Sequence, residues 1–213
     1  MDNAPILRFL RVTLTSTPMT TPRLLLAALL LGASFTAGCN SANTAATMPE
    51  PGFVSLFNGT DLTGWQYRTG EKFDGKTATG DTRFSVGNGM FVVHGTEAGG
   101  RTAQIWTTRQ FPKDFVLRLQ FRSAVNADSG IFIRSPQLQC RDYLVAGPYK
   151  ALTKYRAQDW NDIEITVTGG VARCTYNGEV LEAALKVPTT GGIGLELDRG
   201  QMEYRNIRVK ELP

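Results

Sequence analysis

Apolar and polar residues alternate along most of the chain from residue 52 onward, and this is the period of a β-strand. The clearest run is FVLRLQFR, in which apolar side chains hold the odd positions from Phe115 to Phe121 and polar side chains hold the even positions from Arg118 to Arg122. Shorter runs with the same period lie at 130–134, 161–176 and 192–197. The pattern therefore predicts many short strands, each with one face toward a core.

Glycine-containing turns separate these strands. GNG at 87–89, TGG at 168–170 and YNGE at 176–179 each predict a tight hairpin. The best helical pattern, YKALTKYRAQDW at 149–160, is short. Many short strands at hairpin spacing are typical of an antiparallel β-sandwich or barrel, and one domain at 52–213 accounts for all of them.

Polar residues are concentrated on the outward positions of NADSGIFIRSPQLQCRD, residues 126–142. If Ile131, Ile133, Leu138 and Cys140 face the core, then the outward positions are Asp128, Arg134, Gln137, Gln139 and Arg141. The same reasoning places Glu196 and Asp198 outward in GIGLELDR. We expect Arg122, Arg134, Glu196 and Asp198 to share one sheet face and line a groove there; the alternative is an ordinary solvated face.

The N-terminal segment predicts export. RLLLAALLLGASFTAGC begins with Arg23, continues as an apolar stretch shorter than a membrane span, and ends at Cys39 after small residues. TAGC resembles the lipobox of bacterial lipoproteins, whose cysteine is acylated after cleavage. We expect a signal peptide at 1–38, with Met19 as an alternative start, and an anchor cysteine with a flexible tether at 39–51. The alternative is a plain secretory signal with an incidental cysteine.

Charge and cysteine content exclude one class of function and set the alternatives for the two remaining cysteines. The net charge is +4, and half of it lies before residue 40, so the rest of the chain is too weakly basic for a nucleic-acid binder. Export would leave Cys140 and Cys174 in an oxidising compartment, either as a disulfide or as two separate buried thiols. The chain has one histidine, His94, whose place at the end of a strand predicts a surface residue.

Ordered landmarks from residue 52 to 212 resemble those of the bacterial 3-keto-disaccharide hydrolase family, also called the 3-keto-glucoside lyase and hydratase domain. They are GFVSLFNGTDLTGW, FSVGNGMFVVHG, IWTTRQFPKDFVLRLQFR, NADSGIFIR, DWNDIEITV, YNGEVL, GGIGLE and YRNIRVKEL. The resemblance implies a jelly-roll sandwich of the concanavalin A type, a carbohydrate ligand, and hydrolase or lyase chemistry on 3-keto-glycosides.

The resemblance also suggests roles for the outward polar residues. A ketone at carbon 3 acidifies the proton at carbon 2, so a carboxylate can remove it while a cation stabilises the enolate. We expect Glu196 or Asp198 as the base and Arg134 as the cation. The expected substrate-binding residues are Arg122, Asp128, Gln137, Gln139, Trp106 and Tyr143. Trp65 and Trp160 belong to landmarks that are expected to pack in the core.

The chain departs from the family pattern at three outward positions. Gln137 replaces an acid that many relatives carry, Asp198 replaces a histidine, and Asp128 replaces an asparagine. Two alternatives to an enzyme therefore stay open: a non-catalytic carbohydrate-binding module of the same fold, and a protein-interaction domain of the cell envelope. No cofactor is predicted; a divalent metal is an alternative because a jelly roll offers oxygen ligands, although no Asp-rich loop marks a site.

The lipoprotein prediction can be tested directly. Acyl labelling of the expressed chain should give a lipid-modified product, and the label should disappear in Cys39→Ala because the acylated thiol is lost. Processing should also be sensitive to globomycin. A label that persists in Cys39→Ala would rule out this anchor.

Overall fold

A computed structural model describes residues 50–96, 102–143 and 152–213, and within these ranges every regular element is a β-strand. None of the described residues forms a helix that could cross a membrane. The strands are β1 (Val54–Ser55), β2 (Trp65–Tyr67), β3 (Phe84–Gly87), β4 (Met90–His94), β5 (Ala103–Thr107), β6 (Phe115–Ser123), β7 (Asp128–Ile133), β8 (Gln137–Arg141), β9 (Asn161–Thr168), β10 (Val171–Tyr176), β11 (Glu179–Lys186), β12 (Ile193–Leu197) and β13 (Gln201–Glu211).

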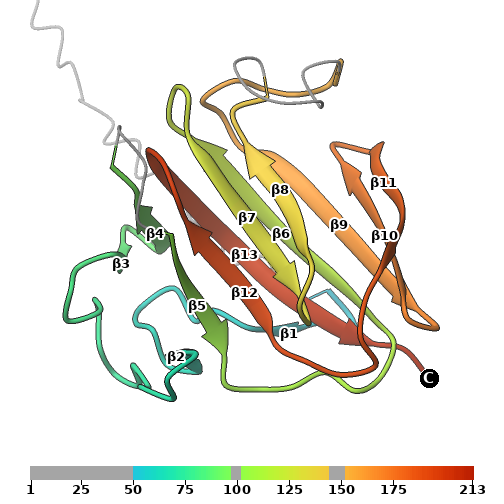
Figure 1. Ribbon diagram of the computed structural model, residues 1–213, viewed down its shortest axis with the longest axis horizontal. Helices are drawn as coiled ribbons and strands as arrows, with labels where there is room; N and C mark the ends of the chain where they lie inside the picture. The colour runs from blue at the N-terminus through green and yellow to red at the C-terminus, as the bar shows by residue number, and fades with distance from the viewer. Residues whose placement is uncertain (1–49, 97–101, 144–151) are drawn as a thin grey trace, which may run out of the picture. The chain divides into compact units, whose positions relative to one another are not determined.

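The strands form two antiparallel sheets that face each other. The larger sheet has the order β11-β10-β9-β6-β13-β4-β3, with β1 also paired to β13, and the smaller sheet has the order β2-β5-β12-β7-β8. In Figure 1 the strands β5, β12, β7 and β8 lie in front of β13, β6 and β9. This is the predicted jelly-roll β-sandwich of the concanavalin A type, so the fold prediction is confirmed.

The core lies between the two sheets and follows the alternation in the sequence. Along β6, buried and half-buried residues alternate without a break from Phe115 to Ser123. Trp65 is fully buried against Phe91, with ring centroids 4.9 Å apart, and its indole nitrogen donates to the Leu56 carbonyl at 2.9 Å. Because aromatic side chains bury the largest apolar areas, this cluster contributes strongly to stability. Its position confirms the prediction for Trp65.

The predicted hairpins are present because their turn residues adopt left-handed backbone angles. Asn88 and Gly89 have φ of 52° and 75°, and Asn177 and Gly178 have φ of 46° and 83°. Two successive positive φ values are those of a type I′ turn, whose twist matches that of the flanking strands. His94 is exposed at the end of β4, as predicted.

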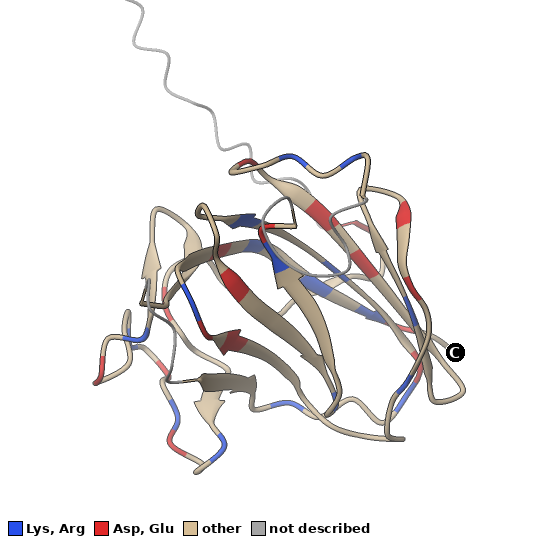
Figure 2. Ribbon diagram, turned by 45° about the horizontal axis from the view of Figure 1, so that its top comes forward, with Lys and Arg blue, Asp and Glu red and all other residues tan. Residues whose placement is uncertain are grey.

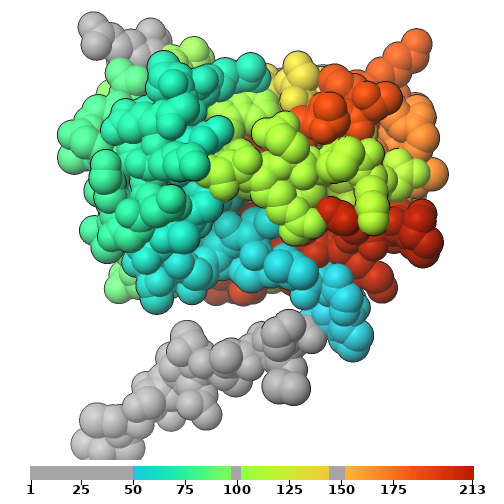
Figure 3. Space-filling model, turned by 90° about the horizontal axis from the view of Figure 1, so that it is seen from below, coloured from blue at the N-terminus to red at the C-terminus, as the bar shows by residue number. Residues whose placement is uncertain are grey.

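The segment between β1 and β3 wraps around one end of the sandwich. Figure 3 shows that these residues, coloured cyan to teal, cover a broad area beside the lime-coloured chain that follows β5. Within the segment, Leu62 donates to the Lys76 carbonyl and Phe73 donates to the Trp65 carbonyl, at 2.8 and 3.0 Å. These bonds fix β2 at the edge of the smaller sheet, where it pairs with β5.

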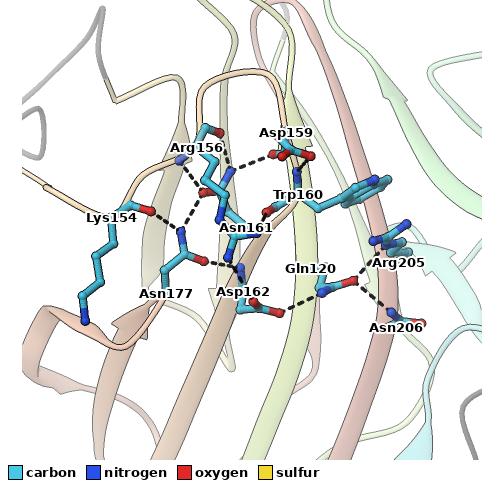
Figure 4. A network of polar contacts seen from close by, with 10 residues as sticks. All are labelled: Gln120, Lys154, Arg156, Asp159, Trp160, Asn161, Asp162, Asn177, Arg205 and Asn206. Carbon is cyan, nitrogen blue, oxygen red and sulfur yellow. Dashed lines mark hydrogen bonds and ion pairs between the residues drawn. The ribbon is translucent and has the colours of Figure 1, made fainter.

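The best helical pattern, at 149–160, forms no helix over its described part, because residues 152–160 form turns and bends. Asn161 organises this region from a fully buried position (Figure 4). Its side-chain nitrogen donates to the carbonyls of Arg156 and Asp159, and its oxygen accepts from the Arg156 amide and from Asn177. A buried amide with its polar atoms satisfied holds the loop in a non-helical shape.

Trp160 was predicted to pack in the core, and this is wrong. It is half-buried, and the guanidinium of Arg122 lies 4.9 Å from its ring centroid. The guanidinium of Arg205 lies 3.8 Å from the same ring (Figure 4). Both arginines project outward from the larger sheet, from β6 and β13. Cation–π contacts with two arginines therefore hold the ring on the outer face of that sheet.

The two cysteines described by the structure do not form a disulfide. Cys140 and Cys174 are free and buried, and they reach the core from β8 in the smaller sheet and β10 in the larger sheet. Burial raises the pKa of the Cys174 thiol to about 12 and raises the pKa of Cys140 as well. The alternative of two separate buried thiols thus holds, and both are kept as unreactive thiols.

Candidate functional site

The outward side of the smaller sheet carries a group of polar side chains that we call the polar face. Strand pairing brings them together: Glu196 in β12 pairs with Gln104 in β5, and Asp128 in β7 pairs with Arg141 in β8. The neighbouring pairs Leu195–Ile131 and Gly130–Gln139 set Glu196 beside Gly130. The polar face consists of Gln104, Asp128, Gln137, Gln139, Arg141, Glu196 and Asp198.

Glu196 is buried although it lies on the outward side of the sheet, with 8 % of its surface exposed. The Gln137 side chain lies across Gly130 and donates a hydrogen bond to the Glu196 carboxylate. A Cβ atom added at Gly130 would come within 2.1 Å of the Gln137 amide nitrogen. The missing side chain at Gly130 therefore lets Gln137 cover and contact the carboxylate.

The pKa of Glu196 is raised to about 7, chiefly by burial and further by the nearby charges of Asp198 and Asp128. The hydrogen bond from Gln137 and the charge of Arg141 act in the opposite direction and lower it. A carboxyl group with a pKa near neutrality can both accept and return a proton, which is the requirement for general acid–base catalysis.

An ion pair lies next to Glu196 on the polar face. Arg141 contacts the Asp128 carboxylate at 2.9 Å, and Arg199 lies 3.9 Å from the same oxygen. Burial nevertheless raises the pKa of Asp128 above its usual range, and the charge of Asp198 adds to this effect. Figure 2 shows acidic and basic positions on strands of both sheets. Arg141 and the adjacent Arg199 therefore offset part of the negative charge of the three carboxylates on the polar face.

One donor of Arg141 has no hydrogen-bond partner. The Gln139 side-chain amide forms two hydrogen bonds in its favoured orientation. The amide nitrogen donates to the Ser129 carbonyl at 3.0 Å, and the amide oxygen accepts from Arg141 at 2.6 Å. The Nε of Arg141 is buried without a hydrogen-bond partner. An unpaired buried donor costs about 1–3 kcal/mol, so an acceptor group bound here would be favoured.

Trp106 is sandwiched, which differs from the expected open stacking surface. Its ring lies over Gly194, where an added Cβ would come within 2.9 Å of the ring, and the guanidinium of Arg68 covers it at 4.0 Å from the centroid. Its indole nitrogen is buried without a partner. A sugar could stack on Trp106 only after the exposed Arg68 side chain moves off the ring.

Arg134 does not reach the polar face, so the prediction that it shares one sheet face with Glu196 is wrong. Its backbone φ is +63°, and this left-handed angle turns the side chain toward one end of the sandwich. There it donates to the carbonyls of Pro188 and Lys113 at 2.6 and 2.7 Å and lies over the Phe115 ring. Arg134 therefore links the segments that contain Lys113 and Pro188 by hydrogen bonds and stabilises the fold.

Arg122 and Tyr143 also lie away from the polar face, so the structure does not bring them together with Glu196. Arg122 projects from β6 in the other sheet and pairs with Glu203 at 2.5 Å. Tyr143 is fully buried, packs edge-to-face with Tyr155 and Tyr176, and donates to the Gln139 carbonyl at 2.6 Å. The predicted common groove thus contains Glu196 and Asp198, but neither Arg122 nor Arg134.

The sequence reasoning overlooked Arg141, Gln104 and Arg68 as site residues. Arg141 could have been found, because a tight turn between β7 and β8 fixes the register that pairs it with Asp128. Gln104 and Arg68 reach the site through pairings between distant strands, for which the sequence carries no local signal. Among the described residues, no group of three or more His, Cys, Asp or Glu could hold a metal ion.

The raised pKa of Glu196 predicts a pH-dependent effect on stability. In the folded protein the group titrates near 7, whereas in the unfolded chain it titrates near about 4.3, so stability is lost as pH rises between these values. Urea unfolding should show that the advantage of Glu196→Gln over the native chain grows by about 1–2 kcal/mol from about pH 5 to about pH 8.

Glu179 supplies a matched control, because hydrogen bonds from Thr153 and Lys154 lower its pKa. It is ionised in both states over this interval, so the effect of Glu179→Gln should not change with pH. An equally constant effect for Glu196→Gln would contradict the assignment.

Comparison with known proteins agrees with this architecture. A family model described as a 3-keto-alpha-glucoside-1,2-lyase-like domain matches residues 52–210. A proposed glycosyl hydrolase from Parabacteroides distasonis ATCC 8503 shares the fold, with a TM-score of 0.58 and 17% identity over 76% of this chain and 94% of that one. The carbohydrate binding module CBM66 from Bacillus subtilis gives a TM-score of 0.49 and 11% identity over 74% and 100%.

The level of similarity decides what each comparison supports. At 17% identity, the Parabacteroides structure establishes the fold alone. The match to the carbohydrate binding module, with a TM-score below 0.5, is too distant to support an inference. A search of curated proteins found no match. The family model spans nearly all of the two-sheet region. The chain therefore belongs to the family of 3-keto-alpha-glucoside-1,2-lyase-like domains.

Proposed function

We propose that the protein cleaves 3-keto-glycosides by elimination and hydration, with Glu196 as the acid–base residue. Family membership and the sandwich fold support a carbohydrate-active, hydrolase-like protein. The observation that carries the finer proposal is a buried carboxyl with a pKa near 7 beside a guanidinium that has a free N–H. Proton removal next to a ketone can use such a carboxyl as the base and such an N–H as a donor to the enolate oxygen.

The reaction balances with Glu196 and water alone. Glu196 takes the proton from carbon 2, and the electron pair of the C–H bond forms an enolate with the carbon 3 ketone. The bond between carbon 1 and the glycosidic oxygen then breaks, the leaving oxygen takes the proton that Glu196 removed from carbon 2, and an unsaturated ketone remains. Water adds across the new double bond, which places hydroxyl on carbon 1 and hydrogen on carbon 2.

Arg141 replaces Arg134 as the group that stabilises the enolate. It lies on the polar face with Glu196, whereas Arg134 donates to two backbone carbonyls elsewhere. Its free Nε is a donor for the developing negative charge on oxygen, and Asp128 and Gln139 hold its terminal nitrogen. A donor held in place before reaction needs little reorganisation when the charge develops.

Carbohydrate binding without turnover is the second candidate. It is favoured by Gln137, which contacts Glu196 at a position where many family members carry an acid. A single carboxyl at this point would then serve hydrogen bonding to sugar hydroxyls. Binding of a 3-keto-disaccharide by the native protein without release of sugar would support this candidate.

We also propose that the protein is exported and lipid-anchored in the cell envelope, as Cys39 predicts. The segment 1–49, with Cys39, lies outside the described residues.

Loss of the acid–base group should abolish turnover. With a 3-keto-disaccharide as substrate, Glu196→Gln should lower kcat about 10²–10⁴-fold, because the amide cannot accept the carbon 2 proton. Free sugar release measures the rate. The matched control is Glu164→Gln, which removes a carboxylate paired with Arg118 on the other sheet and should leave the rate unchanged. Native-like turnover by Glu196→Gln would exclude Glu196 as the acid–base residue.

Substitutions of Arg141 and Arg134 should differ in their effect on catalysis. Arg141→Gln should lower kcat/KM about 10–1,000-fold, because it removes a donor to the transition state. It should also lower Tm, because the largely buried Asp128 loses its ion-pair partner. Arg134→Gln should lower Tm by several degrees, since two backbone carbonyls and the Phe115 ring lose their partner, and should leave kcat/KM within about threefold. A reversed pattern of defects would restore Arg134 as the catalytic cation.

A further inference from the structure

A hollow of about 260 Å³ adjoins the polar face at its β5 edge. Its lining includes Arg68, Arg83, Tyr67, Thr102 and Gln104. Gln104 belongs to both regions, because it lines the hollow and pairs with Glu196 across the strands. A ligand that reaches Glu196 with one sugar ring could therefore place its next ring in this hollow.

The hollow carries excess positive charge among its described residues. Arg68 forms none of the ion pairs between described residues; its Nε donates only to the Gln104 oxygen, at 3.2 Å. Arg83 pairs with Asp81 at 3.4 Å, but this carboxylate also accepts hydrogen bonds from Tyr67 and Thr79 at 2.8 and 2.7 Å. Asp81 therefore neutralises part of the charge of Arg83, and no described carboxylate pairs with Arg68.

Arg68 is also held in a defined position. Its guanidinium stacks on the Trp106 ring at 4.0 Å, and Gln104 binds its Nε, so its two terminal nitrogens remain for a ligand. A planar guanidinium with two parallel N–H donors matches the geometry of a carboxylate. Stacking reduces the side-chain freedom that would be lost on binding, which favours recognition.

We propose that this hollow is a subsite for a sugar carboxylate, so that the substrates include 3-keto-glycosides linked to a uronic acid. Arg68 binds the carboxylate and Arg83 adds to the attraction. This subsite rests on the proposed function, because it takes the part of the substrate that Glu196 releases. It also explains why Arg68 stacks on Trp106: the ring serves as the support of the arginine.

Binding of two matched ligands tests the proposal. The ligands are a 3-keto-glucosyl-glucuronate and its glucuronamide, which have nearly the same size and differ in charge. Titration calorimetry with Glu196→Gln prevents turnover during the measurement. The acid should bind about tenfold more tightly than the amide at about 0.05 M salt, and the difference should shrink at about 0.5 M salt because exposed charges are screened.

Variants of the hollow locate the effect. Arg68→Gln in the same background should reduce the preference for the acid to about twofold or less, and Arg83→Gln should reduce it partly. Arg173→Gln is the matched control, since it removes an exposed arginine from β10 in the other sheet and should keep the preference. Equal binding of acid and amide, or a preference that survives Arg68→Gln, would overturn the subsite.

The outcome for the subsite is separable from that for the proposed function. If the native protein cleaves the amide and shows no preference for the acid, then the subsite is wrong and the proposed function stands. If it neither binds nor cleaves either ligand, then both are wrong.

Discussion

Two positions without side chains, Gly130 and Gly194, determine the shape of the polar face. Any side chain at Gly130 would collide with Gln137, and any side chain at Gly194 would collide with the Trp106 ring. Because neither position carries a side chain, Gln137 lies across Gly130 and contacts Glu196, and the Trp106 ring lies over Gly194. This close cover removes water from a carboxyl group on the outward side, and the loss of water is the main cause of its raised pKa.

The charges around Glu196 then decide what the buried carboxyl can do. Asp198 and Asp128 oppose its ionisation, while Arg141 and the Gln137 amide favour it, so both protonation states stay accessible near neutral pH. A fully compensated carboxylate would be a weak base, and an uncompensated one would stay protonated. The same arrangement leaves one Arg141 donor without a partner. A family fold, a titratable acid and an unpaired donor are together consistent with elimination chemistry on a keto sugar.

Local patterns in the sequence were sufficient for the fold and for much of the polar face. Period-two alternation and Asn-Gly turns predicted the strands and hairpins, and the outward positions of Glu196, Asp198, Asp128, Gln137 and Gln139 follow from strand parity alone. The positions of Arg134, Trp160 and Tyr143 could not be predicted in this way. A left-handed backbone angle turns Arg134 off the sheet, two arginines hold Trp160 outside the core, and Tyr143 packs against aromatic residues distant in the chain. Arg68 and Gln104 depend on which strands become neighbours, which only the folded chain determines.

The central claim is that the polar face holds Glu196 as a buried carboxyl that titrates near neutrality. The most direct measurement is the side-chain carboxyl ¹³C chemical shift of Glu196 as a function of pH, by NMR on protein with labelled glutamate. Glu196→Gln identifies the resonance, because it removes one signal from the spectrum. The structure predicts a titration midpoint of about 7. A midpoint of about 4.3, the value of a glutamate in water, would contradict this assignment.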